Sequence, residues 1–538
     1  MDLVIKQYID RTETVSSSLI DVLYHLTKPD PSTGQPAANA VLVGRLEAQA
    51  AYEDAVNFLN TKFSSEQDNG SDFQVTVLNN NYYIRFADSA VESVLKTALG
   101  KTEGEGITTQ EAADNSIGEC LSNNSDITTF NEFKYFRKNN TNTTYKINNC
   151  PSLVSIDLSE CTNYPGGTFQ NLPNLEYFNG PNSESGVLAF PEGTTTIGYF
   201  MSFQNLPKLK HIIFPSTMRS FSANEFNGCP NIETITLNPG FETFGGNSFN
   251  QAGNGKLIIS DLNAFFNITW APNNGFVNFF RPCPYFYLKD SNGDLTEITT
   301  VTIPQTKLTI PGAIFKDCKS ITEVVFHSGI TSIGNRAFAT CSNLVIPDLN
   351  LPNLASLGSE AFIGTKVQTI SNLGSVTIIP DGCFWGCKTT SVTIPSSVTI
   401  IEKCAFAGCL LTSIDLGNVV TIKEGAFKDN QALTGTLIIP DSVVNIIKEC
   451  FGGIRISNLE IGTGIENIGE IAFYNNPNLT TVTVKALTPP TLGSVNLPTF
   501  RNCNNLAHIY VPAQSVSAYQ SASGWSTYAG IIQAIPTI

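Results

Sequence analysis

The chain has 538 residues, of which only 14% are charged, and a formal charge of −15. Lys plus Arg number 31 against 46 Asp plus Glu, and no Lys/Arg cluster is present that could displace counterions from nucleic-acid phosphates. No run approaches the roughly 20 apolar residues that cross a bilayer, so we expect neither nucleic-acid binding nor membrane insertion.

The amino-terminal segment has a helical pattern of apolar residues. They recur at alternating steps of three and four, which predicts an amphipathic helix with an a/d seam over three heptads: Ile5, Tyr8, Thr12, Val15, Leu19, Val22 and Leu26. The same segment lacks a basic n-region, a continuous apolar stretch and a lipidation motif, so we expect no secretory leader. The sequence KPDPSTGQP (28–36) ends this helix.

A second helix and a hairpin are predicted to complete this first module. Apolar residues stripe a helix at about 39–63, and FQVTVLNNNYYIRFAD (73–88) is typical of a β-hairpin turned through three Asn residues. Residues 1–100 are therefore expected to form a small α+β module for anchoring or oligomerisation. The heptad seam either packs within the module or pairs with other chains, and a homo-oligomer is one alternative.

The connector 101–144 contains KTEGEGITTQEAA (101–113), which resembles a degenerate EF-hand segment. Glu105 and Glu111 fall near ligand positions, but Lys101 stands where the first Asp is required, and the closing glutamate comes one residue early. A lysine at that position repels the ion. We therefore predict a vestigial segment that binds no metal, in a connector that also forms an amino-terminal cap for the repeats.

A repeated unit occupies residues 145–512. Its marker is a Phe, which we call the plug, at steps of 23, 24, 22, 22, 21, 24 and 22 residues between Phe315 and Phe473. The period lies in the leucine-rich-repeat range. With a degenerate copy at Ile147 it predicts a β-rich solenoid of about 14 coils, whose plugs are Phe169, Phe203, Phe226, Phe249, Phe315, Phe338, Phe362, Phe384, Phe406, Phe427, Phe451, Phe473 and Phe500.

Each coil is expected to begin with a strand. In LTSIDL (411–416) the apolar residues Leu411, Ile414 and Leu416 are predicted to face inward, while Ser413 and Asp415 face outward. Seven of the 13 Cys share the place three residues after the plug, and we predict that they are buried core thiols rather than disulfides or zinc ligands: Cys150, Cys229, Cys318, Cys341, Cys387, Cys409 and Cys503.

The repeats resemble the BspA-like leucine-rich-repeat family, also called the Treponema-type repeat. The resemblance is carried by VTIPSSVTIIEKCAFAGC, IPDSVVNIIKECFGG and LEIGTGIENIGEIAFYNNPNLTTVTV, and it covers roughly residues 145–538. Residues 513–538 look like that family's carboxy-terminal cap, with a short helix around Tyr519 and with Trp525 closing the last coil. The resemblance implies a surface or virion-associated binding protein and supplies no catalytic motif.

Residues 251–300 break the period and are rich in aromatic side chains. We favour an insertion that folds over the rod and fills its own small core; the alternative is an aromatic platform for a glycan or a protein, with Trp270, Phe279 and Tyr285 as its binding residues. DSNGD (290–294) fails two requirements of a calcium loop, and we predict a hairpin turned at Asn292–Gly293.

Together, these patterns predict an α+β binding protein without catalysis or cofactor. The four His residues cannot assemble a Ser/His/Asp set, and no paired-carboxylate cleft or phosphate-binding loop is present. The favoured role is a phage virion component that attaches to a host-surface protein or glycan; the alternatives are a bacterial cell-surface adhesin and an intracellular scaffold. The first module is expected to dock on other virion or surface proteins, and the rod to bind through outward residues: Ser391, Thr393, Ser413, Asp415, Thr481 and Thr483.

Overall fold

The computed structural model describes residues 84–102, 105–115, 117–136, 145–162, 169–197, 203–221, 226–244, 255–270, 284–494 and 496–536, together with two short strands nearer the amino terminus. The chain divides into two compact units. Unit 1 is Met1–Met218 with Glu225–Asn231, and unit 2 is Arg219–Asn224 with Ile232–Ile538. In the described part, no helix is both long enough and apolar enough to cross a membrane.

Two short strands replace the predicted helices at residues 4–6 and 41–43, the described parts of those segments. Strand β1 (Val4–Lys6) pairs in parallel with β2 (Val41–Val43), so Ile5 lies in a strand, opposite Leu42. Both segments are rich in β-branched residues, which favour strands over helices. The other proposed seam residues lie outside the described residues: Tyr8, Thr12, Val15, Leu19, Val22 and Leu26. Most of the predicted hairpin lies there too, and residues 84–88 form no strand.

Helices that the sequence did not predict precede the repeats of unit 1. Helix α3 (Ser89–Ala98) begins after Asp88, whose Oδ1 accepts a hydrogen bond from Ala90 N at 2.8 Å. The other carboxylate oxygen accepts from Thr128 N at 2.6 Å, which ties the helix to the first coil. The remaining elements of this region are α4 (Thr109–Asp114) and the 3-10 helix η1 (Asn131–Phe136).

The repeats of unit 1 form short parallel ladders. The ladders are β3–β5, β4–β6–β9 and β7–β10, formed by β3 (Thr129–Phe130), β4 (Ile147–Asn148), β5 (Ser155–Ile156), β6 (Phe169–Gln170), β7 (Val187–Ala189), β9 (Phe203–Gln204) and β10 (His211–Ile213), and unit 1 also contains β8 (Thr196–Ile197). Unit 1 has an exposed asparagine in the left-handed conformation two positions after Leu121, Ile147, Phe169 and Phe203, and each of the last three asparagines donates from its amide to the side-chain oxygen of the one before it. These bonds, at 2.9, 2.8 and 2.7 Å, join Asn123, Asn149, Asn171 and Asn205.

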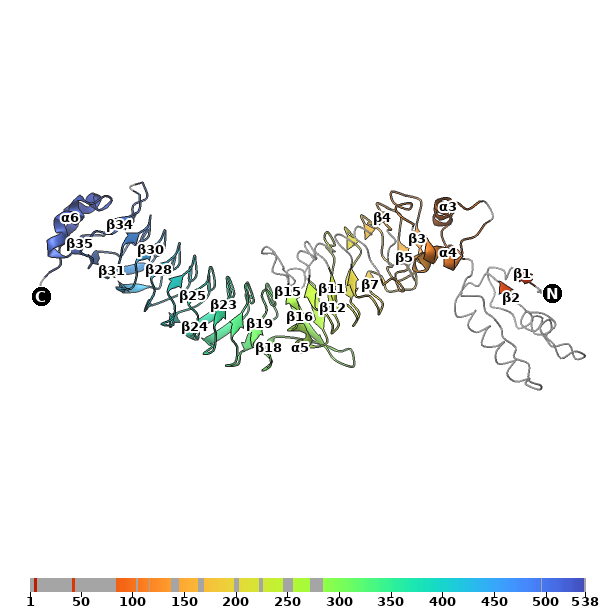
Figure 1. Cartoon of the computed structure of the whole chain (residues 1–538), viewed down its shortest axis with the longest axis horizontal. Helices are drawn as coiled ribbons and strands as arrows, with labels where there is room; N and C mark the ends of the chain where they lie inside the picture. The colour runs from red at the N-terminus through yellow and green to blue at the C-terminus, as the bar shows by residue number, and fades with distance from the viewer. Residues whose placement is uncertain are drawn as a thin grey trace, which may run out of the picture. The chain divides into compact units, whose positions relative to one another are not determined.

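Unit 2 begins with β11 (Ser220–Phe221), and its coils stack along the unit (Figure 1). Four of its sheets lie in the first half of the unit. They are β11–β13–β15, β12–β14–β16–β17, β18–β20 and β19–β21–β23, where the further strands are β12 (Thr234–Leu237), β13 (Thr243–Phe244), β14 (Lys256–Ile259), β15 (Thr269–Trp270), β16 (Tyr285–Lys289), β17 (Leu295–Glu297), β18 (Thr300–Thr302), β19 (Thr309–Ile310), β20 (Glu323–Val325), β21 (Ser332–Ile333) and β23 (Ser356–Leu357).

Three further sheets form the second half of unit 2. One is a ladder of two-residue strands: β25 (Ile378–Ile379), β27 (Ile400–Ile401), β28 (Thr421–Ile422), β30 (Asn445–Ile446), β32 (Asn467–Ile468) and β34 (Thr491–Leu492). The other two sheets contain longer strands. One is formed by β22 (Val345–Asn350), β24 (Lys366–Asn372) and β26 (Ser391–Val392). The other, which is the last sheet of the unit, is formed by β29 (Thr434–Ile439), β31 (Arg455–Ile461), β33 (Thr481–Val484), β35 (His508–Val511) and β36 (Ile532–Ala534).

The plugs form a single stack through the core of unit 2. From Phe315 to Phe500, neighbouring rings are 5.2 to 5.7 Å apart and inclined by 2° to 19°. Such close contact is possible because each coil adds one parallel rung, and the rung spacing of about 4.8 Å is close to the distance between stacked rings. No single coil can bury its plug, so neighbouring coils stabilise one another.

The residue three places after the plug binds the coil before it. Cys341 donates from its thiol to the carbonyl of Phe315 at 2.9 Å, and Cys409 does the same to Phe384 at 3.1 Å. The buried Asn430 replaces the thiol with an amide that donates to Phe406 O at 2.8 Å. The predicted burial of the seven cysteines is confirmed, and burial raises the pKa of the Cys387 thiol to about 11.

The predicted fold class is confirmed, with about 15 solenoid turns against the 14 expected. The cap contains η2 (Ala513–Ser515), α6 (Val516–Ser521), η3 (Trp525–Ile531) and β36. Tyr519 and Trp525 are buried, as expected. The Tyr519 hydroxyl donates to Ala486 O and the Trp525 indole to Pro490 O, both at 2.8 Å.

Two expectations about the solenoid are wrong. The described part of 251–300 is not a separate insertion, because β14 and β16 pair in parallel and continue the sheet; α5 (Leu262–Phe265) lies between them in the sequence. Its buried aromatic residues fill the solenoid core rather than a separate one.

The second wrong expectation concerns the segment 411–416, which forms no strand, and Ile414 is half-buried. The plug-to-plug step that contains this segment, 21 residues from Phe406 to Phe427, is the shortest, which leaves least chain for a strand. The hairpin is confirmed: Gly293 N donates to Asp290 O at 3.1 Å between β16 and antiparallel β17.

Candidate binding surface

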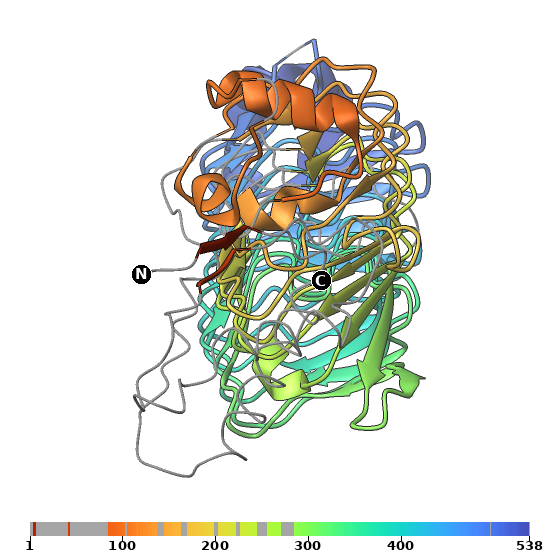
Figure 2. The same cartoon turned by 90° about the vertical axis from the view of Figure 1, so that its right-hand side faces the viewer.

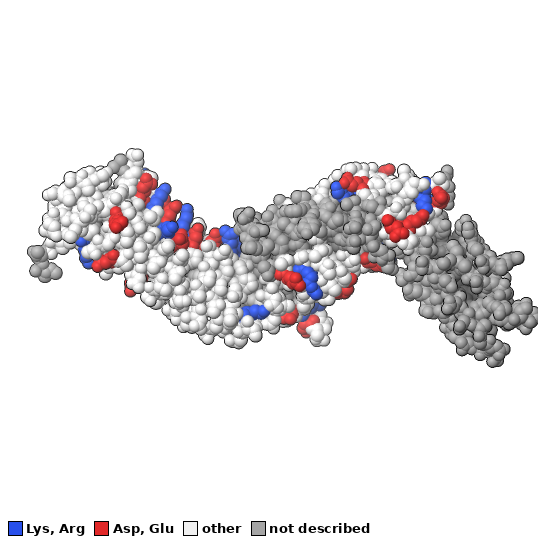
Figure 3. Space-filling view, viewed as in Figure 1, with Lys and Arg blue, Asp and Glu red and all other residues white. Residues whose placement is uncertain are grey.

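The last sheet of unit 2 presents an outward face of mainly uncharged side chains. Inward and outward residues alternate along its strands; in β33, for example, Val482 and Val484 are buried while Thr481 and Thr483 are half-exposed. We call the outward residues of this sheet the C-terminal sheet face: Thr436, Ile438, Asn458, Glu460, Thr481, Thr483, His508, Tyr510 and Gln533. In Figure 3 a broad uncharged surface lies over the strand labelled β24 in Figure 1, in the preceding sheet, whereas a few charged groups lie near the strand labelled β31.

Strand register places these residues in two rows across the sheet. One row runs from Thr436 through Asn458 and Thr481 to His508. The other contains Ile438, Glu460, Thr483, Tyr510 and Gln533. The pairing fixes the spacing between neighbouring side chains, so hydroxyl, amide and carboxylate groups are held at set positions.

Aromatic and apolar groups add to the C-terminal sheet face. The rings of His508 and Tyr510 stack with centroids 5.7 Å apart and an inclination of 11°. Ile438 is 56% exposed, although it lies between the buried Leu437 and Ile439. The sequence predicted Thr481 and Thr483 as binding residues but not His508 or Tyr510, although the alternation in HIYV (508–511) places both of these outward.

The other outward residues predicted for binding lie elsewhere. Ser391 is exposed in β26, opposite Thr369, and Thr393 is exposed just beyond that strand. Ser413 and Asp415 are exposed in the segment that forms no strand, and Asp415 Oδ1 accepts from Gly417 N at 3.0 Å in a turn. This segment separates the two long-strand sheets, so the six residues do not form one continuous face.

The predicted aromatic platform is only partly described. Trp270 belongs to β15, but the description does not extend to its side chain, and Phe279 lies outside the described residues. Tyr285 lies in β16 and is 40% exposed. Phe265 and Phe286, by contrast, are buried against the plug Phe315 at centroid distances of 6.0 and 6.1 Å.

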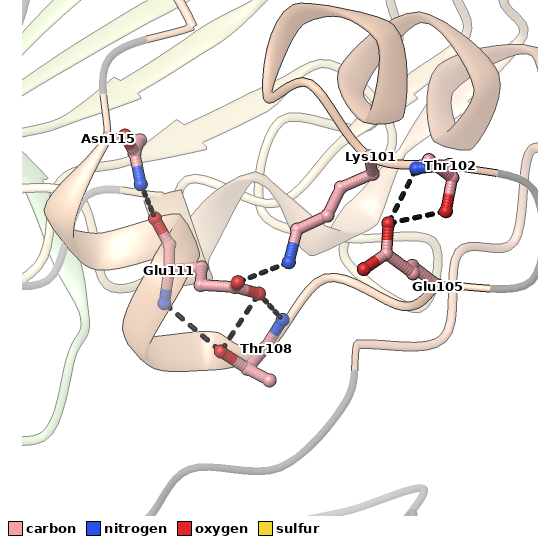
Figure 4. A network of polar contacts seen from close by, with 6 residues as sticks. All are labelled: Lys101, Thr102, Glu105, Thr108, Glu111 and Asn115. Carbon is pink, nitrogen blue, oxygen red and sulfur yellow. Dashed lines mark hydrogen bonds and ion pairs between the residues drawn. The ribbon is translucent and has the colours of Figure 1, made fainter.

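The EF-hand-like connector uses its carboxylates to hold local structure (Figure 4). Lys101 forms an ion pair with Glu111, and Glu111 also accepts from Thr108 N at 2.9 Å in the capping box of α4. Burial raises the pKa of Glu111, but the bonds from Lys101 and Thr108 outweigh it and leave that pKa below its usual value. Glu105 binds Thr102 instead of facing the same point. Within the described residues, no group of three His, Cys, Asp or Glu side chains could hold a metal ion.

The turn edge of unit 2 is charged, in contrast to its sheet face. Figure 3 shows alternating positive and negative groups along the upper edge of its second half. The turns in this half of the unit contain ion pairs of Lys403 with Glu424 at 3.2 Å and of Lys428 with Glu449 at 2.7 Å. Because these charges compensate one another between coils, the edge presents no strong net field to a ligand.

Comparisons with known proteins identify the repeats. The family model for the BspA type leucine-rich repeat region matches in six copies, over residues 184–269, 293–412, 355–438 and 399–523. No curated protein matches the chain.

Three solved structures are similar at low identity. A leucine-rich repeat protein from Bacteroides ovatus has 18% identity and a TM-score of 0.36, with coverage of 65% of this chain and 92% of that one. The pneumococcal vaccine antigen PcpA has 17% identity and a TM-score of 0.38, with coverage of 70% and 83%. A leucine-rich cell surface protein from Faecalibacterium prausnitzii has 18% identity and a TM-score of 0.33, with coverage of 60% and 77%.

Proposed function

We propose that this chain, which belongs to the BspA-type leucine-rich-repeat family, is a binding protein displayed on a cell surface, and that its C-terminal sheet face contacts a protein or glycan on a host surface. Proteins of this repeat family are generally non-enzymatic. The family consists of cell-surface proteins, which favours the cell-surface alternative over the virion expected from the sequence.

The observation that carries this proposal is the continuity of the C-terminal sheet face. Five paired strands hold its side chains, and the backbone beneath them is fixed by the ladder and by the plug stack. A preorganised surface loses little conformational freedom on binding, so more of the contact energy appears as affinity. Hydroxyl, amide and aromatic groups of this kind suit contact with a polar surface through many weak bonds, strengthened by multivalency.

A second partner is proposed for the amino-terminal module, which would anchor the chain. We propose that residues 1–100 join the chain to other surface components, as expected from the sequence. This division of labour leaves the repeats free to face the host.

The binding test uses the full chain with charges introduced on the face. We expect Thr481→Arg with Thr483→Arg to lower binding to host cells at least tenfold, because two long cations disrupt a neutral contact while the inward Val482 stays in place. Thr302→Arg is the matched control: Thr302 is exposed in β18, outside this sheet, and its variant should bind as the wild type does. Equal binding by all three proteins would exclude this face.

Location is tested separately on the source material. Antibody labelling of intact cells and mass spectrometry of envelope and virion fractions should find the protein in the envelope and on the cell exterior. Recovery in purified virions alone would restore the phage alternative and reject the cell-surface proposal.

A further inference from the structure

Strand β16 carries two outward tyrosines beside each other. Tyr285 and Tyr287 flank Phe286, which is fully buried and packs against Phe265 at a centroid distance of 5.0 Å. Because side chains alternate along a strand, anchoring Phe286 in the core fixes both tyrosines on the outward face. The strand rise places their Cα atoms about 6.6 Å apart.

Neighbouring strands hold one of these rings and leave the other exposed. Tyr287 pairs in register with Ile258 on one side and Glu297 on the other, and Lys256 Nζ lies 4.9 Å from its ring centroid. Burial raises the pKa of Tyr287, as do the charge and the hydrogen bond of Glu297. Tyr285, opposite Lys256, is 40% exposed.

The floor next to the rings is apolar and its rim is polar. Ile258 is outward by register, yet it is only 6% exposed. On its β12 side, Thr236 is its partner in register and Thr234 is the partner of Lys256. On the other side, Glu297 lies in β17, beyond Tyr287. Lys256 contacts the ring of Tyr287, and Glu297 accepts a hydrogen bond from the hydroxyl of the same residue. Because both charged groups already interact with Tyr287, the patch favours a neutral ligand over an ionic one.

The size and chemistry of this patch select the class of ligand. A stable protein interface buries roughly 800 Å² on each partner, far more than two tyrosine rings and their rim provide. A β-1,4-linked chain of pyranoses with equatorial hydroxyls, by contrast, is extended. Each of its rings has flat C–H faces that stack on an aromatic ring and a polar edge that bonds to hydroxyls and amines. Two adjacent outward rings can take two successive sugars of a chain.

We propose that Tyr285 and Tyr287 form a carbohydrate-binding site that stacks on a neutral, β-linked hexopyranose chain. In this site Tyr285 supplies the exposed ring, Lys256 positions the second ring, and Thr234 and Thr236 lie within the polar rim. The site belongs to another sheet of unit 2 than the C-terminal sheet face, so it goes beyond the function proposed above and stands or fails separately.

The experiment measures saccharide binding to the full chain by isothermal titration and saturation-transfer NMR, with cellohexaose and chitohexaose as probes and maltohexaose as the α-linked comparison. The wild type should bind at least one β-linked probe and show no binding to maltohexaose. Tyr285→Ala should weaken binding about tenfold, whereas Tyr285→Phe should stay within about threefold because the ring is retained. Trp385→Ala, which removes a ring that is 49% exposed and lies in a turn outside both surfaces, should bind the saccharide unchanged.

Three outcomes would overturn the proposal. They are no binding of either β-linked probe at millimolar concentration, equal binding by the wild type and Tyr285→Ala, and a protein partner whose binding depends on Tyr285 while neither saccharide binds. Lys256→Ala is a second test that leaves the sequence of β16 unchanged. It removes the cation next to the Tyr287 ring and should also weaken saccharide binding. Hydrogen exchange of β14 and β16 checks that each variant is folded.

Discussion

The aromatic core in the amino-terminal cap region of unit 1 is built differently from the plug stack of unit 2. In unit 2 the plugs are nearly parallel, as between Phe384 and Phe406, whose rings are inclined by 9° at 5.4 Å. In the cap region of unit 1 the rings meet at steep angles: Phe130 and Phe133 are inclined by 80°, and Phe133 and Tyr145 by 68°. A constant repeat length brings equivalent residues into line, whereas a segment that ends the stack must fill the core with residues that have no equivalents.

This difference predicts how each unit responds to damage. A stack of equal coils depends mainly on nearest neighbours, so its loss of stability is local. The tilted cluster of unit 1 joins η1, β3 and β6 at once through Phe130, Phe133 and Phe169. The predictions below test this contrast, from the largest expected effect to the smallest.

Removing a plug should have the largest effect. Phe406→Ala should cost about 3–5 kcal/mol of local stability, because the ring is fully buried between two others. Hydrogen exchange should show lost protection in the coils around Phe384 and Phe427, with β35 unaffected. Phe133→Ala, in the tilted cluster, should expose η1, β3 and β6 together. Uniform loss of protection through unit 2 after Phe406→Ala would contradict the nearest-neighbour description.

Replacing the donor three places after the plug should have a smaller effect, which depends on its hydrogen bonds. Asn430 donates to Phe406 O and Phe427 O and accepts from Leu411 N, so Asn430→Ala leaves three buried groups without that partner and should cost about 2–4 kcal/mol. Cys409 donates to the single acceptor Phe384 O through its thiol, and Cys409→Ala should cost about 1–2 kcal/mol. Urea denaturation monitored by exchange measures both. Equal costs would show that side-chain volume, not hydrogen bonding, governs this position.

The sequence predicted the parts of the fold that repeat. Plug spacing revealed the solenoid, and the shared position of the cysteines revealed that they are buried. The sequence also contains a signal for the backbone turns, which the predictions did not use. Two places after the plug the chain is left-handed in every described coil of unit 2 from Phe315 on, and Gly or Asn, which tolerate that conformation, often occur there: Gly364, Gly386, Gly408, Gly453, Asn475 and Asn502.

The candidate surface was less predictable, because strand formation depends on neighbouring coils. Alternation in LTSIDL (411–416) resembles that in LTTVTV (479–484), yet only the second segment forms a strand. The aromatic cluster at 251–300 was assigned to an insertion because its spacing is irregular. Parallel pairing of β14 with β16 across the long intervening segment has no local sequence signal.

The pH dependence of the amino-terminal cap should distinguish two neighbouring carboxylates. Burial raises the pKa of Asp88, but hydrogen bonds from Thr128, Thr129 and Ala90 outweigh it and lower that pKa. Its stabilisation is therefore present above a pH of about 4 and is lost as the pH falls through the lowered value. Asp88→Asn should cost about 1–2 kcal/mol at pH 7, and this cost should shrink in acid.

Glu132 should respond in the opposite sense. Burial raises its pKa, and its Oε2 is buried without a hydrogen-bond partner. The charged form is penalised above the raised value, so Glu132→Gln should stabilise the cap at pH 7, with the gain disappearing below a pH of about 4.5. Hydrogen exchange of α3 at pH 7 and pH 4 measures both variants. A gain from Glu132→Gln that is larger at pH 4 than at pH 7 would contradict the assignment.

The smallest effect is expected on the charged turn edge, where Arg336 and Glu360 form a bidentate pair at 2.7 and 2.8 Å. Both side chains are about a third exposed, at 29% and 33%, so the pair should contribute less than about 1 kcal/mol and weaken in 1 M salt. Both residues are left-handed, with φ of 58° and 55°, and the equivalent residue two coils after Arg336 is Gly382. Arg336→Gly should therefore be less destabilising than Arg336→Ala, because glycine removes the backbone strain while both lose the pair. A double-mutant cycle with Glu360→Ala in urea measures the pair. Equal costs for the glycine and alanine variants would show that the turn stores no strain at this position.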